Sequence, residues 1–229
     1  MMVGMRLQKI MGITVVLALL TAVAAGLSVL NARTSGDSAT WVMISRFVEA
    51  FLLVGFGLPV ARESQLQGSL FVGFEDWTFT FRDIINYGVL PGLVLGLINY
   101  FFFFTYRYSP LVEPRIRDIY DSFVFSLESG VIEEILFRLF ILSCFLFCFR
   151  QLYSRLARVW PGVVAILPKA LAVVLSSLLF AMVHSVYGFT AAFFGGVLLG
   201  LIYIQSGIES AIAAHFFANF LFYSASYLS

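Results

Sequence analysis

The sequence has few charged residues for its length. Only 12% of its 229 residues are charged and 61% are hydrophobic, whereas about 25% of an ordinary soluble domain is charged. This balance excludes a soluble domain and predicts an all-α fold, a polytopic bundle of six to eight transmembrane helices in a lipid bilayer. The net charge of +1 provides no basic face, which argues against nucleic acid as a partner.

Cysteine is equally scarce. The two cysteines, Cys144 and Cys148, are four residues apart in one apolar segment. That spacing favours packing in a helix face over a disulfide framework, and it says little about the redox compartment.

Long apolar runs divide the chain into expected membrane helices. The first run, at 10–30, is longer than the roughly 7–15 apolar residues of a signal peptide, so we expect it to be retained as a helix. Polar or basic linkers at 31–40, 61–86, 107–118 and 150–161 separate the later runs. The later runs are 41–60, 87–106, 119–149, 162–185, 189–205 and 208–227. We predict two parts, N-terminal helices with a polar loop at 1–118 and a catalytic core at 119–229.

The segment at 41–60 allows two interpretations. Arg46 and Glu49 interrupt its apolar character, and Gly55, Gly57 and Pro59 are expected to break its end. The segment either spans the bilayer or lies in the interface with Trp41 as an anchor.

Two adjacent carboxylates and an arginine lie inside the apolar run at 124–149. A charge at bilayer depth costs several kcal/mol unless it is paired or faces a cavity, so these residues indicate function. On a helix, Glu134 and Arg138 are four apart and share a face, which predicts an ion pair. Glu133 is turned about 100° away from Glu134 and lacks a local counter-charge. The unpaired Glu133 is the better candidate for chemistry.

The only two histidines, His184 and His215, also fall in apolar segments. His215 and Asn219 are four apart and share a face, as are Phe180 and His184. Hydrocarbon tolerates such polar groups only around partners or water, so we expect these residues and Glu133 to converge on one site.

The helices predicted at 162–185 and 208–227 should run parallel, because one span separates them. His184 lies at the far end of the first, whereas His215 lies about two turns into the second. The two histidines are therefore expected to be offset in depth.

This set of residues suits hydrolysis. A carboxylate and a histidine can activate water as general base, and a histidine with an asparagine amide can stabilise an oxyanion. Glu133, His184 and His215 are alternatively a workable zinc set with an open fourth position. Because the histidines lie on different helices, without an H-E-x-x-H pair, the sequence alone does not establish a metal.

Three motifs in order resemble the CPBP intramembrane proteases, which include the type II CAAX prenyl endopeptidases and bacterial proteins of bacteriocin self-immunity and peptide processing. The motifs are Glu133-Glu134-x-x-x-Arg138, Phe180-x-x-x-His184 and His215-x-x-x-Asn219. Each motif alone is weak, but all three in order within membrane segments form a specific signal. The resemblance covers residues 122–226 and does not extend to the N-terminal half.

The resemblance implies a role for each residue. Glu133 and His184 would activate the attacking water, and His215 and Asn219 would form the oxyanion site. By the same similarity Glu134 and Arg138 would support the site, and Phe180 would line the pocket. Members of the family have been described as metalloproteases and later as glutamic proteases, and we expect no obligatory cofactor, with zinc as the alternative.

The resemblance predicts an intramembrane endopeptidase that cleaves a membrane-associated or lipidated protein or peptide. The alternative function is a non-catalytic scaffold or immunity protein with a protease-like fold. An ion or proton pathway is a third reading, disfavoured because the sequence shows no repeated halves. The short chain, with no eukaryotic targeting segment, favours a multi-pass protein of a prokaryotic inner membrane. The sequence does not identify the substrate.

Overall fold

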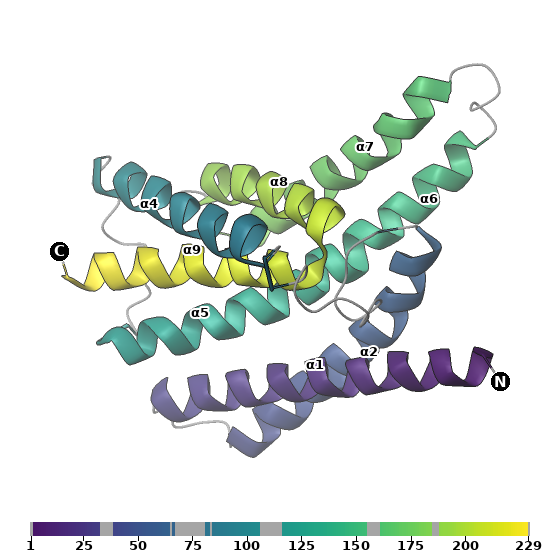
Figure 1. Cartoon of the computed structure of the whole chain (residues 1–229). Helices are drawn as coiled ribbons and strands as arrows, with labels where there is room; N and C mark the ends of the chain where they lie inside the picture. Colours follow the sequence, from purple (N-terminus) through teal and green to yellow (C-terminus); the bar gives the residue numbers. More distant parts are fainter. Residues whose placement is uncertain are drawn as a thin grey trace.

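The computed structural model describes residues 2–32, 39–64, 66, 81–82, 84–105, 116–154, 161–184 and 188–228. Every regular element in these ranges is a helix, which confirms the predicted all-α fold. Much of the predicted linkers, including residues 33–38, 67–80, 106–115 and 155–160, lies outside them. The helices are α1 Met2–Ala32, α2 Ala39–Glu63, the π-helix η1 Ile84–Val89, α4 Leu90–Thr105, α5 Ile119–Glu134, the π-helix η3 Ile135–Leu142, α6 Ser143–Tyr153, α7 Pro161–Met182, α8 Phe189–Ser206 and α9 Ile208–Leu228 (Figure 1).

Several of these helices have the length and composition of membrane spans. Within the described ranges, three are long and apolar enough to cross a bilayer, at Thr40–Glu63, Ile84–Phe102 and Phe189–Ser206. Two shorter apolar helices lie at Met11–Leu27 and Ile166–Met182. The segment at 41–60, which allowed two interpretations, is thus part of one continuous helix that is long enough to span the bilayer.

The predicted break of α2 near Pro59 was wrong, because the helix continues to Glu63. Apolar helices tolerate proline when neighbouring helices satisfy the freed backbone. The glycines that precede Pro59 also serve packing. A Cβ on Gly57 would lie 2.9 Å from the carbonyl oxygen of Leu139, so α2 approaches the backbone of η3 closely at this point.

The long central rod α5–η3–α6 organises the bundle (Figure 1, teal). Its helical course confirms the helix predicted at 119–149, although it ends at Tyr153. A π-helical segment, with wider turns than an α-helix, occupies its middle and starts directly after Glu134. π-Helical segments are rare in proteins, and those that occur often lie at functional sites. The sequence pattern did not predict this one.

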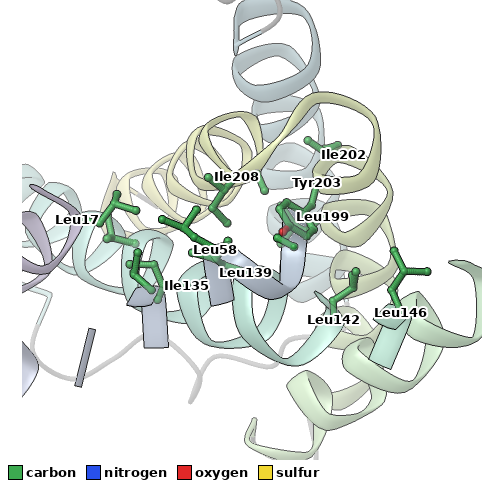
Figure 2. Close-up of a cluster of buried hydrophobic side chains, with 14 of the residues drawn as sticks. Leu17, Leu58, Ile135, Leu139, Leu142, Leu146, Leu199, Ile202, Tyr203 and Ile208 are labelled. Carbon is green, nitrogen blue, oxygen red and sulfur yellow. The ribbon is translucent and has the colours of Figure 1, made fainter. Parts of the chain in front are cut away.

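The other helices pack on opposite sides of this rod. The pair α1 and α2 lies along one side, while α4 and α9 lie on the other, and α8 packs between α7 and α9 (Figure 1). The apolar core joins both sides, because Leu17 and Leu58 belong to the same cluster as Leu139, Leu199 and Ile208 (Figure 2). The predicted boundary near residue 118 remains a prediction.

Close packing of small residues fixes α9 against α4. A Cβ on Gly92 would lie 2.4 Å from the carbonyl oxygen of Ala214, and one on Gly96 would lie 2.7 Å from that of Ala218. Small residues four apart on both helices let the backbones approach, as in many membrane helix pairs. The contact matters for the site, because Ala214 and Ala218 directly precede His215 and Asn219.

We expect Gly92→Ala to destabilise the protein by about 1–3 kcal/mol, because the new methyl group overpacks the α4–α9 contact. Thermal unfolding in detergent measures the effect. Gly12→Ala is the matched control, since a Cβ at Gly12 meets no atom within 4 Å and alanine is the better helix former. Equal stability of the two variants would contradict the predicted close contact.

Candidate active site

Five of the seven residues predicted for the site line one cavity of about 200 Å³, called here the site cavity. It lies among α4, α5, α8, α9 and the end of α7. The predicted residues in its wall are Glu133, Phe180, His184, His215 and Asn219. The other two, Glu134 and Arg138, are completely buried. The expected convergence of residues far apart in sequence is therefore present in the fold.

Close approach of α5 and α9 brings the glutamates to His215. A Cβ on Gly130 would lie 3.1 Å from the backbone nitrogen of Phe216, a contact tighter than most side chains accept. The ring of Phe216 also meets that of Phe123 edge to face, with centroids 5.4 Å apart. Glycine at position 130 thus allows the first motif to meet the third.

A buried ion pair holds His215 in place. Glu134 Oε1 lies 2.8 Å from His215 Nδ1, and Glu134 Oε2 lies 3.3 Å from Arg138 Nε. This confirms the predicted Glu134–Arg138 pair. Arg138 is further held by the ring of Phe180, whose centroid is 4.5 Å from the guanidinium carbon, and by the Gly196 carbonyl, to which it donates at 3.4 Å. The imidazole therefore rests on a carboxylate that is itself fixed.

The second carboxylate faces the other nitrogen of the same ring. Glu133 Oε2 lies 3.8 Å from His215 Nε2, too far for a hydrogen bond. The Glu133 side chain is 30% exposed, whereas that of Glu134 is 0% exposed. Glu133 forms no ion pair with any lysine or arginine whose side chain is described, as the helical spacing predicted. The two neighbouring glutamates differ because one is exposed to the cavity and the other is buried.

His184 lies just beyond the end of α7 at Met182. Its Nδ1 is 2.7 Å from the Phe180 carbonyl oxygen, and its ring centroid is 4.6 Å from that of Phe180. Because a carbonyl only accepts, Nδ1 carries the hydrogen and donates it, which leaves Nε2 as acceptor in the neutral ring. His184 and Glu133 share the cavity wall, but the structure shows no hydrogen bond or ion pair between these two described residues.

The predicted depth offset of the two histidines stays a prediction, although one side chain, Phe180, lies beside both rings. Phe180 contacts both, since its ring centroid is 5.7 Å from that of His215 and 4.6 Å from that of His184. The physical reason is a stagger of the helices. In Figure 1, α7 starts far out beside α6, so its last turn meets the early turns of α9.

Sequence reasoning missed three polar residues of the site cavity, Asn99, Ser129 and Tyr223. Asn219 Nδ2 donates to Ser129 Oγ at 2.8 Å, and Ser129 Oγ donates in turn to the Phe125 carbonyl at 2.9 Å. Ser129 precedes Glu133 by four residues, so the helical repeat places both on one face and could have indicated it. Asn99 lines the cavity from α4, and no sequence motif pointed to it.

The side chains suggested for zinc do not form a ligand cluster. Across the described ranges, no three His, Cys, Asp or Glu side chains lie together so as to hold a metal ion. Glu133, His184 and His215 are all described, and they do not form such a group.

Comparison with known proteins addresses the family. The model of the Rce1-like type II CAAX prenyl endopeptidases matches residues 115–221, a stretch that contains every predicted site residue. Searches of curated proteins and of solved structures gave no match. The matched family and the apolar spans together show an integral membrane protein. Residues 115–221 of this chain are therefore similar to the Rce1-like type II CAAX prenyl endopeptidases, a likeness that supports the CPBP family predicted from the three motifs.

Proposed function

We propose that this protein is an intramembrane endopeptidase that hydrolyses a peptide bond in a membrane-associated or lipidated protein or peptide. One observation carries the proposal. Glu133, His184, His215 and Asn219 come from three helices and line a single cavity, in front of a buried Glu134–Arg138 pair. The similarity of residues 115–221 to the CAAX-type protease family supports the same reaction.

Glu133 and His184 are the proposed water-activating pair. The Glu133 side chain is 30% exposed and lines the site cavity, so this carboxylate can accept a proton from water. His184 presents an acceptor nitrogen in the neutral ring to the same cavity. A water between these groups would be deprotonated as its oxygen bonds to the carbonyl carbon. The C–N bond then breaks, and the proton passes to the leaving amine.

His215 and Asn219 are the proposed oxyanion site. Glu134 fixes the ring of His215, whose Nε2 donates to an oxyanion when the ring carries a hydrogen on both nitrogens. The Asn219 amide uses one N–H for Ser129 and retains a second for the substrate oxygen. Donors fixed before the reaction stabilise the developing charge with little reorganisation.

Ser129 is expected to act on Asn219 as a positioning residue. Ser129→Ala removes the acceptor that holds the amide, and we expect kcat to fall about tenfold with KM nearly unchanged, because the loss concerns the transition state. Ser129→Thr keeps a hydroxyl and should restore most of kcat. An equal loss in both variants would contradict this role and indicate a packing defect instead.

The proposed activity is tested with a panel of fluorogenic lipidated and membrane-anchored peptides in nanodiscs. Wild type is compared with His184→Gln, each with and without a chelator, and His184 is chosen because it is exposed beyond the end of α7. We expect cleavage by wild type that persists with chelator and is lost in the variant.

Other outcomes of this experiment have distinct meanings. Loss of wild-type cleavage with chelator would support the zinc mechanism in place of a glutamate-activated water. Equal cleavage by wild type and by folded His184→Gln would contradict the proposed pair. No cleavage of any substrate, combined with a cellular phenotype that survives in His184→Gln, would favour the scaffold or immunity function.

A further inference from the structure

A second cavity touches Glu133 beside the site cavity. It measures about 270 Å³, lies between α2, α5 and α9, and is called here the polar cavity. Five of its wall residues are polar or charged: Arg46, Glu128, Ser129, Glu133 and Tyr223. Ser129 and Glu133 also line the site cavity, so the two cavities meet at the proposed base.

We propose that the polar cavity supplies water to Glu133 by a path separate from the cavity that binds the substrate. The inference rests on the proposed function, because it concerns the water that hydrolysis consumes. The site cavity is bordered largely by apolar residues such as Leu95, Phe180 and Leu199. A peptide or lipid that fills it excludes water from that side. Glu133 then needs a second approach, and the polar cavity reaches it.

The charges in this wall require water. Arg46 and Glu49 form a 2.6 Å ion pair within the spanning-length helix α2, yet their side chains are 39% and 40% exposed. Charges exposed to hydrocarbon are costly, so charged groups at membrane depth usually face a water-filled space or each other. A water molecule needs on the order of 10–15 Å³ of such space and two or more polar partners, and the polar cavity offers both.

The wall suits water better than a charged substrate group. Arg46 is already neutralised by Glu49, and Glu128 contributes the opposite charge to the same cavity. Charges of both signs around one space hydrate it without selecting a ligand of one sign. The Glu133 side chain is 30% exposed and lines both cavities, so its carboxylate is accessible where the two cavities meet.

The position of the cavity favours entry from one end of the bundle. The start of α2, the start of α5 and the end of α9 lie at the same end (Figure 1). That end is polar at α5, where Asp118 accepts from the Asp121 backbone N–H at 2.8 Å and Arg117 pairs with Asp121 at 3.2 Å. Glu128 lies between this end and Glu133 along the same helix.

Thiol accessibility tests the path without any need for proteolysis. In a background with Cys144→Ala and Cys148→Ala, Ile132→Cys places a thiol in the wall of the polar cavity. Leu52→Cys is the matched control, because Leu52 is 51% exposed and lies about as far from the start of α2 as Ile132 does from that of α5. The probe is a charged thiol reagent that does not cross the bilayer. The proteoliposomes are permeabilised so that the reagent reaches both faces of the membrane.

We expect Ile132→Cys to react at least about tenfold faster than Leu52→Cys, because the reactive thiolate forms only where water reaches it. Equal or slower reaction of Ile132→Cys would overturn the proposal, whether or not any substrate is cleaved. If no substrate is cleaved, the proposed function fails while the labelling result still decides on water access.

Labelling should also affect turnover when a substrate is known. A bulky adduct at Ile132→Cys is expected to lower kcat about tenfold with KM unchanged, since it blocks water rather than substrate. The same adduct at Leu52→Cys should leave both constants unchanged. A rise in KM with kcat retained would overturn the proposal and make the polar cavity a substrate subsite.

Discussion

Glu133→Gln is expected to eliminate proteolysis almost completely. Glutamine has nearly the same shape but does not accept a proton from water, so the contribution of a general base, about 10²–10⁴-fold in rate, is lost. KM should change little, because the carboxylate acts on water rather than holding the substrate. Steady-state kinetics in nanodiscs with a substrate cleaved by wild type measures the effect.

Glu128→Gln is the matched control for that experiment. Glu128 lies on the same helix as Glu133. It lines the polar cavity but not the site cavity. The amide keeps that cavity hydrated, so activity within a fewfold of wild type is expected. Both variants should unfold at similar temperatures, because Glu133 is partly exposed. Substantial cleavage by folded Glu133→Gln would refute its assignment as the base.

Arg138→Met is expected to have the largest effect on stability, about 3–5 kcal/mol, the usual cost of breaking a buried ion pair. Methionine fills much of the space but leaves the Glu134 carboxylate at 0% exposure without its arginine. The carboxylate also holds His215, so activity should fall with stability. Unfolding of the purified protein in mixed micelles measures the change in free energy.

The double variant Glu134→Gln with Arg138→Met separates charge from packing. The amide oxygen of glutamine still accepts from His215 Nδ1 but carries no charge to leave unpaired. The double variant should therefore be more stable than Arg138→Met alone, as replacement of a whole buried pair is often tolerated. If the two variants are equally unstable, the loss arises from packing around Phe180 rather than from the unpaired charge.

Local spacing predicted the parts of the site that lie on one helix. The Glu134–Arg138 pair follows from a separation of four residues, as does the shared direction of His215 and Asn219. The convergence of separate helices followed from the cost of polar groups in hydrocarbon. The all-α membrane fold followed from composition, and the family from the three ordered motifs.

Contacts between distant helices were beyond the reach of local spacing. Glu134 and His215 are 81 residues apart. No local pattern predicts which of the two carboxylates accepts the hydrogen bond from His215 Nδ1. The stagger of α7 depends on how its entire length packs against α6 and α8, so local spacing did not predict that Phe180 contacts both histidines. Asn99 belongs to a helix outside the matched region, and its place in the wall depends on the α4–α9 contact.

The π-helical segment after Glu134 lets one rod serve two sets of neighbours. A single added residue in an α-helix rotates everything after it by about 100°. The wider turns of η3 therefore rotate the side chains of α6 about the helix axis relative to those of α5, without bending the rod away from its partners. The glutamates can face α9, while Leu146 in α6 joins the core. Insertion or deletion of one residue within 139–142, after Arg138, would thus act as a rotation, turning the far half of the rod away from its packing surface while the motif itself stays intact.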